Sequence, residues 1–261
     1  MKIGLIQMQV ESGEKERNIR HAFSLLEEAA REGCRLLVLP ELWTVGYDFR
    51  RIREQATRPG DSLMEGLASF ARWHEVTLAA GTLPLVHEGA LYNTGVVFSP
   101  SGRLQAHYSK RHLFYGYLEA ELMRPGKRAM QTDIGGIASG MAICYELYFP
   151  DLFRAMAKKG TTLVIVPASW PLMHVSRWEV LARARAIENG MYICAVNMVG
   201  AYHGVRLGGH SLLADPEGNV LTEAGADEEI LYGEYDEEKY KDLGKQMAVI
   251  RSVRDGQSGE E

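Results

Sequence analysis

The stretch "RLLVLPELW" at residues 35–43 returns later in the chain as "TLVIVPASW" at residues 162–170. Each is a short apolar run with a proline near its end, and a continuous apolar run is typical of a strand that is covered on both faces. A second pair follows in the same order, because "GVVFSPSGRLQAHY" (95–108) and "HSLLADPEGNVLTEAG" (210–225) both indicate a strand, a Pro-x-Gly turn and a strand. Two pairs in the same order predict that one unit occurs twice.

Helical segments supply the rest of this unit. Four helices are predicted, two in each copy, at residues 13–33, 61–75, 150–160 and 174–189. With the strands between them, each copy becomes a β-α-β-α-β-β-β unit. Two mixed sheets that pack face to face, with the helices outside, would bury the apolar face of every element. We therefore predict an α/β fold, a four-layer α-β-β-α sandwich with a pseudo-twofold internal duplication.

The composition limits the classes of partner. The chain has 261 residues, of which 46% are hydrophobic and 24% charged, and its formal net charge is −5. These values are ordinary for a globular protein, and no block of Lys and Arg stands out, so neither nucleic acid nor a membrane is an expected partner. No apolar run approaches the ~20 residues of a membrane span, and the N-terminus lacks a signal-peptide pattern.

The cysteines indicate a compartment. Cys34, Cys144 and Cys194 are far apart in the chain and form no CxxC pair. This usage argues against a disulfide framework and favours a reducing environment. We therefore expect a cytoplasmic protein.

The chain after about residue 236 shows no strong hydrophobic period. We predict one domain over residues 1–236 and a C-terminal arm over residues 237–261 that is extended and disordered at its end. An extended arm needs a surface to lie on, and a second subunit is the expected surface. The sequence thus predicts a homodimer or a higher homo-oligomer.

Four polar residues are candidates for chemistry. Glu41 follows the first apolar run, Lys110 ends the strand "LQAHYSK", Cys144 ends the strand "GMAIC", and Glu119 lies in the irregular segment between the last two. Ligands bind beyond the carboxyl ends of strands in helix-covered sheets, so these side chains are expected to converge. Each also has a common structural alternative: a small buried hydrophobe for the cysteine, a cap or solvated charge for the glutamates, and a solvent-reaching side chain for the lysine.

Four motifs resemble those of the nitrilase superfamily, the carbon–nitrogen hydrolases: "LVLPELWTVGY", "YSKRHLF", "GMAICYELYFPD" and "PASWP…ARAIEN". The resemblance covers residues 1 to about 236 and is greatest for short amidases of the omega-amidase type. It implies that Glu41 is the general base, Lys110 the catalytic lysine, Cys144 the nucleophile and Glu119 a second glutamate of the site. It also implies the α-β-β-α sandwich, and dimers that pack through the helix after the cysteine.

These roles fit hydrolysis of a small carboxamide at its non-peptide C–N bond. Glu41 would take the Cys144 proton, while Lys110 and the backbone N–H groups after the cysteine would favour the thiolate. Lys110 and the backbone N–H of Tyr145 would stabilise the tetrahedral oxyanion. Ammonia then leaves a cysteine thioester, and Glu41 activates the water that releases the carboxylic acid.

No metal or cofactor is expected. The eight histidines show neither an HExxH motif nor a paired Cys/His set. His112, His174 and His210 are instead expected to form hydrogen bonds or to line a pocket.

The expected partner is a small-molecule amide substrate. The candidates for the walls of its pocket are Tyr47, Phe114, Tyr145, Tyr148 and Trp170.

The identity of the amide stays open. The run "CYELYFP" departs from the family's "CYDxRFP", because Glu146 replaces the Asp and Tyr148 the Arg. This change puts a carboxylate-bearing substrate in question, although Arg177 and Arg206 could compensate. A short aliphatic monoamide and an omega-amide of an oxo acid are both compatible with the sequence.

Nitrilases and N-carbamoyl amide hydrolases use the same triad and are the enzyme alternatives. The non-enzyme alternative is a binding scaffold that has kept the fold.

Overall fold

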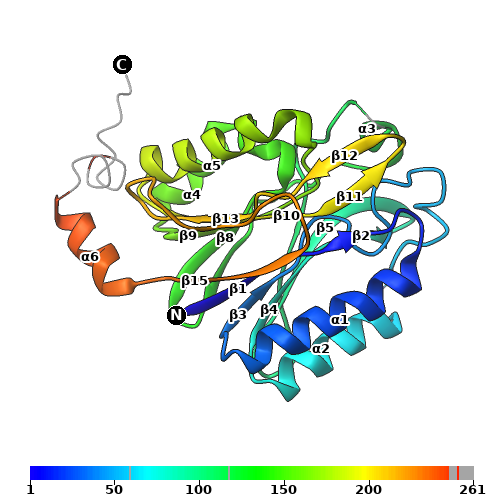
Figure 1. Ribbon diagram of the computed structural model, residues 1–261, viewed down its shortest axis with the longest axis horizontal. Coiled ribbons are helices and arrows are strands. Elements are labelled where there is room, and N and C mark those ends of the chain that lie inside the picture. The colour runs from blue at the N-terminus through cyan, green and yellow to red at the C-terminus, as the bar shows by residue number, and fades with distance from the viewer. Residues whose placement is uncertain (59, 117, 247–251, 253–261) are drawn as a thin grey trace.

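The computed structural model of the chain describes residues 1–58, 60–116, 118–246 and 252. Its layers run helix, sheet, sheet, helix, with α1 and α2 on one outside and α4 and α5 on the other (Figure 1). The four-layer α-β-β-α sandwich expected from the sequence is confirmed.

The first sheet has six strands and carries α1 (Lys15–Arg31) and α2 (Ser62–Trp73) on its outer face. Its three central strands are parallel, and the strands on either side are antiparallel to them. In spatial order the strands are β15 (Glu229–Glu234), β1 (Lys2–Gln7), β3 (Leu36–Val38), β4 (Thr77–His87), β5 (Ala90–Phe98) and β6 (Leu104–Ser109).

The second sheet also has six strands and is covered by α4 (Pro150–Lys158) and α5 (Val175–Asn189). It too has three parallel central strands between antiparallel ones. In spatial order the strands are β14 (Val220–Glu223), β13 (Leu212–Ala214), β10 (Tyr192–Asn197), β9 (Leu163–Ala168), β8 (Ile137–Met141) and β7 (Gln131–Ile134).

The internal duplication is visible in the strand order. The series β1-β3-β4-β5-β6 of the first sheet corresponds to β8-β9-β10-β13-β14 of the second, with the same parallel and antiparallel steps. One further antiparallel strand lies beside the first member of each series, β15 beside β1 and β7 beside β8. The two similar stretches quoted first are therefore equivalent strands, β3 and β9.

Close packing of the two sheets leaves little room between them. Gly95 of β5 faces Met141 of β8, and a Cβ at Gly95 would come within 2.2 Å of the Met141 sulfur. Asp61 caps α2 by accepting a hydrogen bond from the Leu63 N–H at 3.0 Å. Each fully buried aliphatic side chain of this core contributes about 1.5–3 kcal/mol to folding.

A small third sheet was not predicted. It consists of β12 (Val205–Gly208), β11 (Val199–Tyr202) and β2 (Gln9–Val10). The β11–β12 hairpin projects from the second sheet at the end where α3 also lies (Figure 1).

The chain after residue 236 differs from the predicted extended arm. Glu237–Gln246 form a helix, α6, whose Tyr240 is buried with ring centroids 6.4 Å from Tyr192 and from Tyr235. The helix forms because this one aromatic side chain has a place in the core, a feature that carries no period in the sequence. The rest of the predicted arm, including its disordered end, lies outside the described residues, apart from residue 252. In the described part of the chain, no helix is both long and apolar enough to cross a bilayer.

Candidate active site

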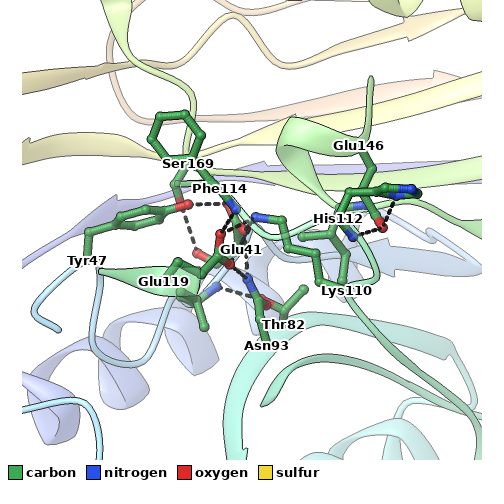
Figure 2. A network of polar contacts seen from close by, with 12 residues as sticks. Glu41, Tyr47, Thr82, Asn93, Lys110, His112, Phe114, Glu119, Glu146 and Ser169 are labelled. Carbon is green, nitrogen blue, oxygen red and sulfur yellow. Dashed lines mark hydrogen bonds and ion pairs between the residues drawn. The ribbon is translucent and has the colours of Figure 1, made fainter. Parts of the chain in front are cut away.

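Three of the four candidate residues meet as charged groups in the interior. The Lys110 Nζ lies 2.8 Å from Glu41 Oε1 and 3.0 Å from both carboxylate oxygens of Glu119 (Figure 2). All three side chains are fully buried. Lys110 directly follows β6, Glu41 lies in the turn after β3, and Glu119 begins the short helix α3 (Glu119–Leu122).

Neutral donors complete the shell around the two carboxylates. The Asn93 Nδ2 donates to Glu41 Oε1 and to Glu119 Oε1, both at 2.8 Å (Figure 2). The Tyr47 hydroxyl donates to Glu41 Oε2 at 3.2 Å, and the Phe114 N–H donates to Glu119 Oε2 at 2.8 Å. Asn93 was not predicted, although a polar residue before the apolar strand "TGVVF" was a signal for it. Tyr47, predicted only as a pocket wall, also contacts the carboxylate.

The charges of this cluster depend on one another. Burial alone would lower the pKa of Lys110, but the negative charges of Glu119 and Glu41 outweigh it and raise the pKa, so the ammonium keeps its proton. Burial raises the pKa of Glu119, and the charge of Lys110 offsets only part of that effect. The cluster is thus a stable ammonium between two carboxylates.

Cys144 lies beside this cluster, but not at the end of its strand. The strand β8 stops at Met141, and Cys144 is the first residue of a 3₁₀ helix, Cys144–Tyr148. Burial and the neighbouring Glu41 raise the pKa of the thiol well above its usual value, against the smaller effects of Lys110 and the Ser169 N–H. Lys110 does favour the thiolate, but its effect on the pKa is smaller than that of burial and of Glu41. The thiol therefore keeps its proton at neutral pH, with the Glu41 carboxylate as its neighbour.

Backbone strain accompanies the candidate residues. Cys144 has a φ of 49°, Leu42 after Glu41 has a φ of 46°, and Leu118 before Glu119 has a φ of 50°. A positive φ in a residue other than glycine costs on the order of 1–3 kcal/mol and persists only where the surrounding structure enforces it. The fold holds the candidate side chains by local conformations that the sequence alone would not favour.

The turn that carries Glu41 rests on a bulge in β4. The Leu42 N–H donates to the Thr82 hydroxyl at 2.9 Å, and the Thr82 N–H donates to the Pro40 carbonyl at 3.1 Å. Gly81, with a φ of 58°, forms the bulge, and a Cβ there would lie 1.9 Å from the Pro40 carbonyl oxygen. Only glycine allows the two strands to approach this closely, and the approach fixes the direction of Glu41.

Another buried carboxylate, that of Glu146, joins the segments that follow β6 and β8. Glu146 Oε1 accepts hydrogen bonds from the Tyr108 hydroxyl and the Arg111 N–H at 2.8 Å, and from the His112 N–H at 3.1 Å. Glu146 Oε2 accepts from the Ile143 N–H at 2.7 Å. His112 thus contacts Glu146 rather than the pocket (Figure 2).

Cys144 opens into a pocket of about 420 Å³. All five wall residues expected from the sequence line it: Tyr47, Phe114, Tyr145, Tyr148 and Trp170. The other lining residues are Ser169, Pro171, His174, Arg177, Tyr202, Val205 and Leu207, of which only His174 and Arg177 were considered from the sequence.

Three of the unexpected lining residues come from the β11–β12 hairpin, which the sequence did not predict. Arg206 of that hairpin and His210 are not among the residues that line the pocket. Among the described residues, one group could hold a metal ion, formed by Glu179, His210 and Glu223, and none of the three lines the pocket.

The fold and the site define a class of enzyme. The sequence model of the carbon-nitrogen hydrolase family matches residues 2–245, so the chain belongs to this family. It is an amidase of the carbon–nitrogen hydrolase superfamily.

Relatives and solved structures agree with this membership. The chain is 32% identical to the 2-oxoglutaramate amidase of Bacillus subtilis (strain 168) over 252 residues, which covers 97% of each chain. It is 32% identical to the human omega-amidase NIT2 over 263 residues, 97% of this chain and 95% of the relative. A structure of the E41Q mutant of the Nesterenkonia sp. AN1 amidase, with acrylamide added at its active-site cysteine, superposes with a TM-score of 0.83 at 28% identity, covering 94% of this chain and 97% of that one.

Proposed function

We propose that Cys144 is the nucleophile with which this amidase converts a small carboxamide and water into a carboxylic acid and ammonia. The observation that carries the proposal is the place of Glu41. Its carboxylate is a neighbour of the Cys144 thiol and lies 2.8 Å from the Lys110 ammonium, and Cys144 itself lines the pocket. A base, a cation and a nucleophile thus meet where a substrate carbonyl can enter.

The first half of the reaction forms a thioester. Because the thiol is protonated at rest, Glu41 takes its proton as the sulfur attacks the amide carbon. The new C–S bond places negative charge on the carbonyl oxygen. Lys110 and the backbone N–H of Tyr145, which follows the nucleophile in the 3₁₀ helix, stabilise this oxyanion. The C–N bond then breaks, and the nitrogen leaves as ammonia with the proton that Glu41 held.

The second half regenerates the enzyme. Glu41 accepts a proton from water as its oxygen attacks the thioester carbon. The C–S bond breaks, the sulfur regains the proton, and the carboxylic acid leaves. Both carboxylate oxygens of Glu119 lie 3.0 Å from the Lys110 nitrogen, so we assign Glu119 the positioning of the ammonium.

The proposal is tested by ammonia release from a panel of amides, nitriles and N-carbamoyl amino acids. Cys144→Ala is expected to lower the rate by at least about 10³-fold while the protein stays folded. Cys194→Ala is the matched control, since Cys194 is also a buried thiol but lies in the core strand β10. Full activity of Cys144→Ala would contradict the role of the thiol. Release from nitriles alone would favour the nitrilase alternative, and release from N-carbamoyl compounds alone the carbamoyl hydrolase.

The scaffold alternative makes a different prediction. A scaffold would release no ammonia from any compound, and iodoacetamide would fail to label Cys144. The open pocket beside the thiol supports the enzyme instead.

We also propose that the chain acts as a homodimer. Met173, Val180 and Ile187 are spaced by seven residues along and just before α5, and all three are exposed, by 76%, 65% and 43%. An apolar stripe on the outer face of a helix whose inner face is already buried favours a second copy as its cover. In this proposal the interface lies on α5, the neighbour of the helix that the family resemblance implied. Val180→Glu should shift the mass measured by light scattering to that of a monomer, and Trp73→Glu on α2 should not.

A cytoplasmic location accompanies these proposals. All three cysteines are free and buried, which suits a reducing compartment. Fractionation of the cells that make the protein would test this.

A further inference from the structure

We infer that the substrate is an uncharged amide whose acyl part carries an aromatic ring, of the arylalkyl amide class. The inference rests on the proposed function and specifies the substrate of the same site. It is carried by three properties of the pocket: its walls, its charges and its size.

Aromatic side chains make up nearly half of the pocket lining. Six of the thirteen lining residues are aromatic: Tyr47, Phe114, Tyr145, Tyr148, Trp170 and Tyr202. Tyr148 and Trp170 stack with ring centroids 5.4 Å apart at an interplanar angle of 22°. Tyr145 meets Phe114 edge-on at 5.2 Å. The two pairs are joined, because the Tyr145 and Tyr148 ring centroids lie 5.5 Å apart, so ring faces and ring edges form one continuous aromatic wall that suits a planar ring.

The charges of the pocket do not suit an anionic acyl group. The buried cluster beneath Cys144 contains two carboxylates and one ammonium, so it has no excess of positive charge. Among the described lining residues, Arg177 is the one side chain with a permanent positive charge, and it is exposed at the start of α5. A substrate carboxylate inside the pocket would lose its water without gaining a buried cation. In the single chain, a carboxylate at Arg177 would gain only a solvent-screened contact; in the proposed dimer Arg177 lies between the interface residues Met173 and Val180.

The pocket is too large for the shortest acyl groups to fill. A volume of about 420 Å³ holds on the order of ten water-sized groups. An acyl group of two or three carbons would leave most of this space filled with water. A ring joined to the amide by one or two methylenes would fill it and keep the amide carbon beside the Cys144 sulfur.

The test compares three primary amides under one assay: 3-phenylpropanamide, propanamide and glutaramate, which carries a carboxylate at its far end. We expect kcat/KM for 3-phenylpropanamide to exceed the values for the other two by at least about tenfold, on the scale that one or more methylenes contribute in an apolar pocket. A higher kcat/KM for glutaramate, or for propanamide, would overturn the inference and leave the amidase function intact.

Variants of Tyr148 test whether its stack with Trp170 sets the preference for an aromatic acyl group. Tyr148 is 39% exposed, so its replacement should not unfold the protein. Tyr148→Ala should raise KM for 3-phenylpropanamide by about tenfold more than it raises KM for propanamide, because the short amide does not reach the stack. Tyr148→Arg should in addition raise kcat/KM for glutaramate. Trp73→Ala, an exposed aromatic on α2, is the control and should change none of these values. Equal losses for all three amides would overturn the assignment of the stack as an acyl-binding wall.

A binding measurement separates this inference from the chemistry. In Cys144→Ala, calorimetry with the intact amides should give a lower Kd for 3-phenylpropanamide than for glutaramate. If the wild-type enzyme hydrolyses none of the amides, the proposed function fails, and this order of Kd values still supports or overturns the pocket preference by itself.

Discussion

The Lys110 ammonium lies 2.8 Å from the Glu41 carboxylate, and neither side chain has any surface exposed to solvent. Two charges removed from water are costly unless each meets an opposite charge at hydrogen-bonding distance. Here the lysine has two such partners, since Glu119 contacts the same nitrogen. The cluster therefore depends on all of its members, and the loss of one leaves a buried charge without compensation.

Replacing Lys110 by methionine should destabilise the protein as well as inactivate it. The variant keeps the volume of the side chain but leaves two carboxylates buried together, which should lower the free energy of unfolding by about 3–5 kcal/mol. Denaturant unfolding at pH 7 measures this cost. Lys2→Met removes a lysine whose ion pair with Glu32 is half-exposed, and should cost less than about 1 kcal/mol. If both variants lost the same free energy of unfolding, Lys110 and Glu41 would not be in contact in solution.

Glu41→Gln should stop the reaction before the thioester. The amide side chain keeps the shape of the site but cannot accept the Cys144 proton, and the thiol is protonated at rest. Mass spectrometry of the variant mixed with a substrate should find no acyl adduct on Cys144. A trapped adduct would contradict the assignment of Glu41 as the base for the first step. Glu121 is a neighbouring surface glutamate in α3 and gives the control. The Glu121→Gln variant should react with the substrate as the wild type does.

Asn93 should determine the pH at which kcat/KM falls on the acid side of its pH profile. Its amide donates a hydrogen bond to Glu119, and this contact lowers the pKa of that carboxyl against the effect of burial. In Asn93→Leu the pKa of Glu119 rises further, so Glu119 becomes neutral at a higher pH as the solution is acidified. If the ionised form positions Lys110, the acid limb of kcat/KM should move to higher pH. Thr94→Val, next in the strand, removes a contact to Ser109 and should leave the limb in place.

The sequence predicted the layers and the candidate residues, because both depend on local patterns. Paired apolar runs such as 35–40 and 162–167 mark equivalent strands, and Glu41, Lys110 and Cys144 each lie in a short motif. The mutual distances of these residues follow from the way the two sheets pack. That packing depends on contacts such as Gly95 against Met141, which no local pattern records.

What the sequence could not supply has specific physical causes. The protonated thiol of Cys144 results from burial beside Glu41, which is a property of the assembled site. The lining residues of β11 and β12 come from a hairpin of four-residue strands with no clear alternation. Helix α6 was taken for an extended arm because its contacts with the fold, Tyr240 in the core and Lys239 on Asp215, join residues that no local pattern connects.

Glu146 should act on the rate through the residues on either side of it. Its carboxylate accepts backbone hydrogen bonds from Arg111, next to Lys110, and from Ile143, next to Cys144. Glu146→Gln replaces one acceptor oxygen by a donor, which should lower stability by about 1–3 kcal/mol and reduce kcat more than it raises KM. Glu146→Asp restores the charge and should recover part of kcat. A fall in stability with kcat unchanged would show that Glu146 only supports the fold.

The pH dependence of stability should reveal how α6 is attached. Asp215 accepts hydrogen bonds from the Glu217 and Asn219 N–H groups at 2.9 Å, and from Lys239 of α6 at 2.9 Å. Burial alone would raise the pKa of Asp215, but the contacts with Lys239 and Asn219 outweigh it and lower the pKa below the unfolded value. The stabilisation is therefore present at pH values above about 3.9, the pKa of an unfolded aspartate, and is lost as the pH falls through the folded pKa.

Asp215→Asn should accordingly lower the free energy of unfolding by about 1–3 kcal/mol at pH 7, and the difference from the wild type should shrink as the pH falls below about 4. Denaturant unfolding at a series of pH values measures both effects. Lys239→Met should cost less than about 1 kcal/mol, because Lys239 is 42% exposed and its ion pair is screened. A difference that stays constant down to the lowest pH would mean that the turn, and with it the anchor of α6, depends on the shape of Asp215 and not on its charge.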